Sequence, residues 1–150
     1  MRYRRRQFAH AAVALLALPW AAVPARAGMT EADLDAAIRE LVGDAAIQDG
    51  GVRLSLPAIA ENGAQVPLTV AVDSPMTPAD YVTAIHLLAT RNPTPGIASF
   101  RLSPALARAE VQTRIRIAEE QAVIALAVHA DGRVVRAAAS LKVTTGGCLS

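Results

Sequence analysis

The most constraining feature of this sequence is the strict alternation of apolar and polar residues along 107–117. One set of alternate positions holds small or apolar residues and the other holds charged or amide residues, namely Ala109, Val111, Thr113, Ile115 and Ile117 against Glu110, Gln112, Arg114 and Arg116. Because successive side chains of a β-strand point to opposite faces of the sheet, this period of two predicts a strand with one buried and one solvated face. The buried face requires a second layer of structure.

The sequence after Gly51 predicts further short strands, punctuated by Pro, Gly, Asn and Asp. Ala122–Ala130 is almost wholly apolar, which is typical of a central strand, and the Asp131-Gly132 turn pairs it with Arg133–Val143. Residues 73–78 are not expected to form a strand, because Pro75 and Pro78 have no backbone N–H to donate to a β-ladder. The remaining strands are expected at Val52–Leu56, Val66–Val72, Tyr81–Thr90 and Ile97–Leu102. Six or seven strands with few aromatic residues predict a mainly β fold, an immunoglobulin-like antiparallel β-sandwich.

One helix is predicted before the strands. Thr30 is a suitable N-cap, and apolar residues recur with helical spacing before Gly43 ends the pattern, at Leu34, Ile38, Leu41 and Val42. The single apolar face predicts that this helix packs on the sandwich. Residues 44–51 are expected to form a loop.

The N-terminus is predicted to be an export signal of the twin-arginine (Tat) type. Arg5-Arg6-Gln7-Phe8 precedes an apolar run over 11–23 and the small-x-small site Ala25-Arg26-Ala27. A membrane anchor is disfavoured because the run is short and contains Pro19, whereas a spanning helix needs about 20 residues. We therefore expect a signal peptide at 1–27, a periplasmic mature chain without membrane insertion, one domain at 28–143 and a flexible arm at 144–150.

Removal of residues 1–27 changes the sign of the net charge. The full chain carries a formal +2, but five of its 15 Lys and Arg lie in the signal, so the mature chain keeps ten against 13 Asp and Glu. No Lys/Arg cluster with interleaved aromatic residues remains to indicate a nucleic-acid partner.

Residues with catalytic or metal-binding chemistry do not form a recognisable constellation. His86 and His129 lack HxH, HExxH or CxxC spacing, and each is interpreted as a partly buried, hydrogen-bonded histidine. Glu119-Glu120 suits a solvated turn. Arg114 and Arg116 suit a solvated sheet face, with anion or partner binding as the alternative. Neither a catalytic nor a metal site is predicted, and no cofactor is expected.

The one cysteine, Cys148, follows the last predicted strand in Thr144-Thr145-Gly146-Gly147-Cys148. An extended segment from Thr144 carries the sulfur ~17 Å from the domain, and the two glycines keep that segment thin and mobile. An unpaired cysteine in an exported protein indicates an intermolecular bond or a reactive thiol, and an idle tail is the alternative. With an ordinary pKa, only ~3% of the thiol is ionised at pH 7. This favours a passive covalent carrier.

The chain resembles the SoxY family, the sulfur-carrying subunits of the periplasmic Sox thiosulfate-oxidation system. The resemblance covers most of the mature chain, and its most specific part is the terminal Gly-Gly-Cys. It rests on Ile59-Ala60-Glu61-Asn62-Gly63, Val72-Asp73-Ser74-Pro75-Met76, Arg91-Asn92-Pro93, Thr113-Arg114-Ile115-Arg116 and Val143-Thr144-Thr145-Gly146-Gly147-Cys148.

The resemblance implies an immunoglobulin-like carrier, not itself an enzyme, that forms a heterodimer with a SoxZ-like subunit. It implies that a SoxAX-like haem protein joins thiosulfate oxidatively to Cys148. A SoxB-like hydrolase then releases sulfate, and a sulfane dehydrogenase is a further candidate partner. Cys148 holds each sulfur intermediate in turn, on the arm formed by Thr144, Thr145, Gly146 and Gly147.

One departure leaves alternatives open. The family's arm typically ends Gly-Gly-Cys-Gly-Gly, whereas Leu149-Ser150 follows the cysteine here. Leu149 either hinders entry into a standard partner channel or fits a modified one, so a SoxY-like carrier of another sulfur pathway is an alternative. A periplasmic immunoglobulin-like binding module is a second, and a small redox enzyme, which needs a metal or a second thiol, is a third.

Overall fold

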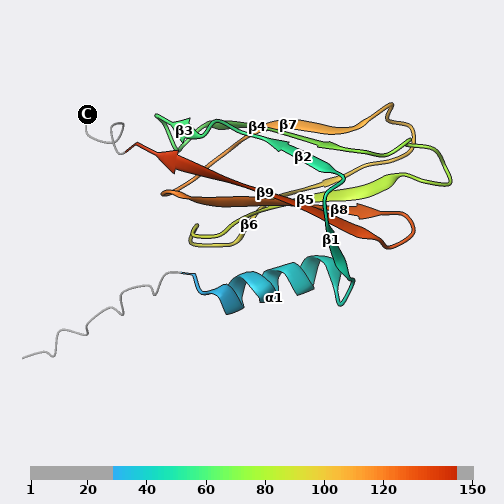
Figure 1. The fold of residues 1–150 in the computed structure, drawn as a ribbon, viewed down its shortest axis with the longest axis horizontal. Helices are drawn as coiled ribbons and strands as arrows, with labels where there is room; N and C mark the ends of the chain where they lie inside the picture. The colour runs from blue at the N-terminus through green and yellow to red at the C-terminus, as the bar shows by residue number, and fades with distance from the viewer. Residues whose placement is uncertain (1–28, 145–150) are drawn as a thin grey trace, which may run out of the picture.

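Two β-sheets pack face to face within residues 29–144, the part of the chain that the computed structural model describes (Figure 1). The six-stranded sheet has the order β1-β9-β8-β5-β6, with β3 also paired to β9, and the three-stranded sheet has the order β2-β4-β7. The strands are β1 (Ile47–Asp49), β2 (Val52–Ser55), β3 (Ile59–Ala60), β4 (Val66–Val72), β5 (Val82–Ala89), β6 (Gly96–Arg101), β7 (Ala109–Ile115), β8 (Gln121–His129) and β9 (Val134–Val143). The predicted immunoglobulin-like sandwich is confirmed.

The main core lies between the two sheets. The alternating segment forms β7, whose end residues Ala109 and Ile115 are buried while Glu110 and Arg114 are exposed. From the facing sheet, Ile85, Leu87 and Val123 enter the same cluster and are almost fully buried. The period of two in the sequence thus identified the buried face of β7 correctly.

Strand β8 is buried on both faces, which explains its almost continuous apolar sequence. Val123 and Ala125 face the core between the sheets, whereas Ile124 and Leu126 belong to a second cluster on the outer face of the six-stranded sheet. Strand β8 lies between β5 and β9, as expected for a central strand.

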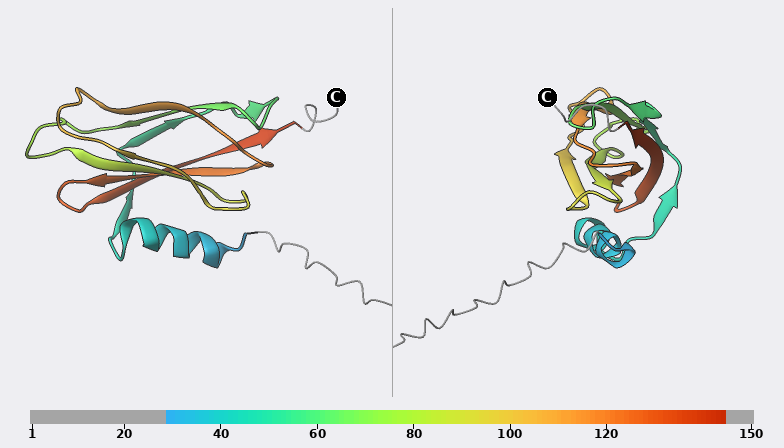
Figure 2. Two further views of the ribbon diagram at one scale, coloured as in Figure 1. Left: turned by 180° about the vertical axis from the view of Figure 1, so that it is seen from behind. Right: turned by 90° about the vertical axis from the view of Figure 1, so that its left-hand side faces the viewer.

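The helix α1 (Glu31–Val42) covers that outer face, and Figure 2 shows it lying below the sandwich from two sides. Thr30 caps the helix in both directions: its Oγ1 accepts from the Asp33 N–H at 3.2 Å, and its N–H donates to Asp33 Oδ2 at 2.9 Å. The Thr30 N–H and the Thr30 hydroxyl, which also donates to Asp33 Oδ2 at 2.7 Å, lower the pKa of the Asp33 carboxyl. Leu34, Ile38 and Leu41 pack on the outer cluster. The predicted helix, its caps and its packing are confirmed. No helix within 29–144 is long and apolar enough to cross a membrane.

The prediction that residues 44–51 form a loop was wrong, because Ile47–Asp49 forms β1, parallel to β9. Arg136 Nε donates to Asp49 Oδ1 at 2.8 Å, and the Gly50 N–H donates to the Arg136 carbonyl at 3.1 Å. Strand β3 is also parallel to β9 and was not predicted. Both strands are too short for a periodic pattern and exist because β9 offers a free edge.

Candidate functional site at the exit of the C-terminal segment

Strand β9 carries the chain toward Cys148 and ends at one end of the sandwich, beside β3 (Figure 1). We call this end the exit end; it comprises β3, the turn at 61–65, the loops at 90–95 and 116–120, and the last residues of β9. Thr145, Gly146, Gly147 and Cys148 lie outside the described residues, and Thr144 is the last residue described. Of the predicted site, the structure therefore describes the exit end, from which the segment that leads to Cys148 begins.

Main-chain hydrogen bonds hold β9 up to its final residue. The Lys142 N–H donates to the Ala58 carbonyl at 2.9 Å, and the Thr144 N–H donates to the Ala60 carbonyl at 3.0 Å. Thr144, predicted as the first residue of the arm, is thus hydrogen-bonded to β3. The point from which the chain continues to Cys148 is fixed relative to the sandwich.

A turn containing Gly63 packs against the same place. The Ile117 N–H donates to the Gly63 carbonyl at 2.8 Å. A Cβ atom on Gly63 would overlap the carbonyl oxygen of Ile117 and would lie 3.0 Å from Val143 Cγ1. Only glycine permits this close approach between the turn, the end of β7 and the end of β9.

The loops of the exit end are joined through the side chain of Asn92. Its Nδ2 donates to the Arg116 carbonyl at 2.9 Å, and its Oδ1 accepts from the Ala118 N–H at 3.1 Å and from Gln121 Nε2 at 2.8 Å. Gln121 is only 4% exposed, and its Oε1 accepts from the Arg91 N–H at 2.7 Å. This network ties the β5–β6 loop to the β7–β8 loop.

The charges at the exit end are exposed and largely offset one another. Lys142, the cation nearest to Cys148 in the sequence, has its Nζ 3.9 Å from Glu120 Oε1, and both side chains are more than half exposed. Such a pair contributes little to stability. Glu119, Arg114 and Arg116 are exposed as predicted. These charges are therefore solvated, and hydrogen bonds hold the described part of the exit end together.

His86 and His129 are both hydrogen-bonded, as interpreted from the sequence, although His129 is buried more completely than expected, and both lie away from the exit end. His86 Nδ1 lies 2.7 Å from Ser99 Oγ across the β5–β6 pair, and partial burial followed by the charge of Arg101 lowers the pKa of its imidazole. His129 is buried at the far end of β8, where Arg133 Nη2 donates to its Nδ1 at 3.2 Å. Within residues 29–144, no group of three or more His, Cys, Asp or Glu side chains is placed to hold a metal ion.

Comparison with known proteins identifies the family. The model of the family described as sulfur oxidation protein SoxY matches residues 38–148, a range that contains the whole sandwich, the exit end and Cys148. The chain belongs to the SoxY family. Among solved structures, this SoxY family member is similar to the sulfur carrier protein SoxY from Chlorobium limicola f thiosulfatophilum, with 34% identity and a TM-score of 0.65 over 77% of this chain and 99% of the other. A comparison with curated protein sequences finds no match.

More distant structures share the sandwich alone. The superoxide reductase (neelaredoxin) from Ignicoccus hospitalis is 16% identical with a TM-score of 0.56, covering 63% of this chain and 81% of that one. A putative superoxide reductase from Thermotoga maritima is 13% identical with a TM-score of 0.56, covering 65% and 86%. At these identities the likeness shows the fold and no shared chemistry.

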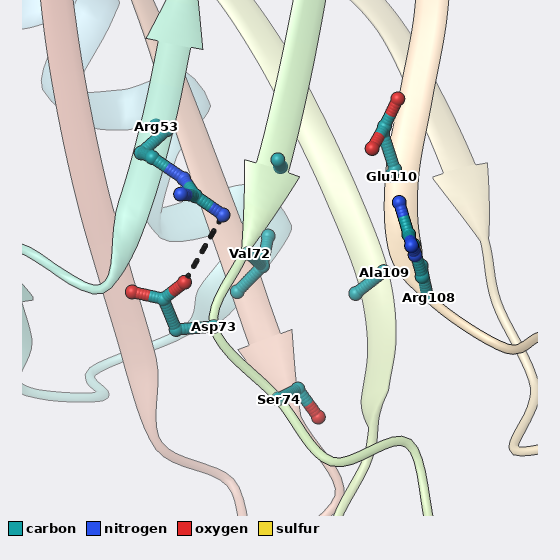
Figure 3. Close-up of a pocket in the computed structure, with 8 residues that line it drawn as sticks. Arg53, Val72, Asp73, Ser74, Arg108, Ala109 and Glu110 are labelled. Carbon is teal, nitrogen blue, oxygen red and sulfur yellow. Dashed lines mark ion pairs between the residues drawn. The ribbon is translucent and has the colours of Figure 1, made fainter.

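A shallow depression of about 260 Å³ lies at the opposite end of the SoxY sandwich and was not foreseen from the sequence. Figure 3 shows Arg53 pointing to Asp73, with the two charged groups 3.4 Å apart. Arg108, just before strand β7, and Glu110, within it, line the other side of the depression. The length of β4, about 20 Å, separates it from the exit end. All four side chains are exposed, so the depression has the character of a solvated, mixed-charge surface.

Proposed function

We propose that this protein is a covalent sulfur carrier in which Cys148 holds thiosulfate-derived intermediates on an arm formed by Thr144, Thr145, Gly146 and Gly147. The observation that carries the proposal is the SoxY family match, which extends to Cys148, the one cysteine of the chain. The similar structure from Chlorobium is described as a sulfur carrier protein. The hydrogen bonds of the exit end support an arm that starts from a fixed point.

The proposed chemistry uses one sulfur atom of this chain, that of Cys148, and is catalysed by other proteins. Loading joins the Cys148 thiol to the outer sulfur of thiosulfate; a new S–S bond forms, one proton is released, and two electrons pass to a haem protein. Hydrolysis then adds one water across the bond to the sulfonate group, which releases sulfate and two protons and leaves a persulfide anion on Cys148. The protein is not the enzyme in either step, and it carries no cofactor besides the bound sulfur.

The partners we propose follow from the SoxY family. A SoxZ-like immunoglobulin-like subunit forms a heterodimer with this chain, and a SoxAX-like cytochrome, a SoxB-like hydrolase and a sulfane dehydrogenase act on the arm. Sedimentation of the natively produced protein as a monomer, with no co-purifying subunit, would contradict the heterodimer.

We further propose that the protein works in the periplasm after Tat export and cleavage after Ala27. The support is Arg5-Arg6 before a short apolar run, a signal that lies outside the described residues. Replacement of both arginines by lysine is expected to stop export. Undiminished periplasmic accumulation of that variant would make the segment an ordinary secretory signal.

The decisive experiment replaces Cys148 by Ser in the full chain with its partner subunit. We expect thiosulfate oxidation in a reconstituted system to disappear, while the melting temperature and subunit binding stay unchanged, because the residue lies beyond the sandwich. Intact-mass spectrometry of protein from its native source is expected to show sulfur and sulfonate adducts on Cys148. Full activity of the Cys148→Ser protein would end the carrier hypothesis and favour a binding module.

Substitution of Leu149, the residue after the cysteine, tests which sulfur pathway the protein serves. If Leu149 is merely tolerated in a standard channel, Leu149→Gly matches or exceeds the native rate. If Leu149 fits a modified channel of another sulfur pathway, the same substitution lowers the rate.

A further inference from the structure

Two large hydrophobic side chains are exposed among the described residues, and they lie at opposite ends of the sandwich. Ile59 in β3 is 59% exposed, and Leu106 in the β6–β7 connection is 46% exposed. Ile59 belongs to the exit end, beside the start of the segment that leads to Cys148. Leu106 lies at the other end, because β6 runs antiparallel to β5 and away from the exit end. Ile59 is therefore the one of the two that lies close to Thr144, the last residue described before Cys148.

The exposure of Ile59 follows from the geometry of β3. Alternation along this two-residue strand turns Ala60 inward, where it is 7% exposed, and turns Ile59 outward. Ala58 is exposed and Pro57 is half-buried, so a short apolar segment faces solvent at 57–59. We call this segment the 57–59 patch.

The 57–59 patch is held at a fixed distance from the exit point. Ile59 pairs with Lys142 in the parallel β3–β9 ladder, and Thr144 follows two residues later. A rise of about 3.3 Å per residue and a strand spacing of about 4.8 Å place Ile59 about 8 Å from Thr144. The hydrogen bonds from Lys142 to Ala58 and from Thr144 to Ala60 maintain this arrangement.

The length of the segment between Thr144 and Cys148 limits how far away an enzyme can act. Four residues span at most about 14 Å between Cα atoms and the cysteine side chain adds about 3 Å, so a catalytic centre that reaches the sulfur lies within about 17 Å of Thr144. If the catalytic centre lies inside a channel, the rim of that channel is closer to the sandwich than the centre is. Any enzyme acting on Cys148 must then approach the exit end, where the 57–59 patch lies within about 8 Å of Thr144.

We propose that the 57–59 patch, with Ile59 at its centre, is the docking contact for the apolar rim of the channel of the enzymes that act on the sulfur of Cys148. This inference rests on the proposed carrier function and identifies the surface through which it operates. The Ile59 side chain loses its contact with water only while an enzyme is bound. It therefore increases the affinity of the loaded carrier for the enzyme and does not change the rate of the chemical step.

The test compares Ile59→Thr, which keeps the β-branched shape, with Leu106→Thr as the matched control at the opposite end. Each full-length variant, with its partner subunit, is loaded with thiosulfate and supplied at varied concentration to the hydrolase that releases sulfate. We expect Ile59→Thr to raise the KM for the carrier about tenfold with kcat unchanged. Ile59→Leu is expected to retain the native KM, and Leu106→Thr to leave both constants unchanged.

A second measurement distinguishes failure of docking from failure of the carrier. Alkylation of Cys148 by iodoacetamide is expected at the native rate in the Ile59→Thr protein, because a small reagent needs no docking surface. An unchanged KM for Ile59→Thr would overturn the docking role while leaving the Cys148→Ser result intact. Loss of the co-purifying subunit in Ile59→Thr would also overturn it, since Ile59 would then belong to that interface.

Discussion

Asn92→Ala is expected to destabilise the exit end without changing the packing of the hydrophobic core. The substitution removes the three hydrogen bonds that join the β5–β6 loop to the β7–β8 loop, through the Arg116 carbonyl, the Ala118 N–H and the Gln121 amide. Each such bond contributes roughly 1 kcal/mol net, and the loss is larger where a buried group loses its partner. Gln121 is buried, although its Nε2 keeps a 3.3 Å contact to the Glu119 carbonyl. We expect a loss of about 2–3 kcal/mol.

Thermal unfolding followed by circular dichroism measures this loss. For a domain of this size, 1 kcal/mol corresponds to about 4 °C, so the melting temperature is expected to fall by about 8–12 °C. The matched control is Asn62→Ala, because Asn62 is exposed and its Oδ1 accepts one local bond, from the Ala64 N–H at 2.9 Å. The control is expected to lose no more than about 1 kcal/mol. Equal shifts for the two variants would refute the assignment of Asn92 as the residue that joins the loops.

Two further predictions concern packing and pH. Gly63→Ala is expected to cost about 1–3 kcal/mol in urea unfolding, because the new Cβ overlaps the Ile117 carbonyl, whereas Gly96→Ala, where nothing lies within reach, is expected to be near neutral. His86 has a folded-state pKa below its ordinary value, so the unfolded chain takes up the proton first. The contribution of His86 to stability is therefore complete above about pH 6.5 and is lost as the pH falls toward the folded-state pKa. His86→Asn is expected to flatten the decline in stability between pH 7 and 5; an unchanged decline would contradict the assignment.

Some helices and strands form because of residues within the element itself, and local patterns in the sequence predicted these elements. The alternation along 109–115 predicted β7 and its buried face, and Thr30 and Gly43 marked the ends of α1. These predictions succeed because side-chain period and end-capping depend on neighbouring residues. The same holds for the motif around Cys148, which together with four other segments indicated the SoxY family from the sequence.

Only the tertiary structure decided how the exit end is held together. Strands β1 and β3 have three and two residues, and each exists because β9, more than 80 positions later, offers its edge. Asn92 and Gly63 look like ordinary turn residues, yet their roles depend on 116–121 and on Val143. The exposure of Ile59 beside Thr144 likewise follows from the β3–β9 register. Contacts between residues far apart in the chain leave no periodic signal, because the free energy that creates them is gained only when the folded chain brings both partners together.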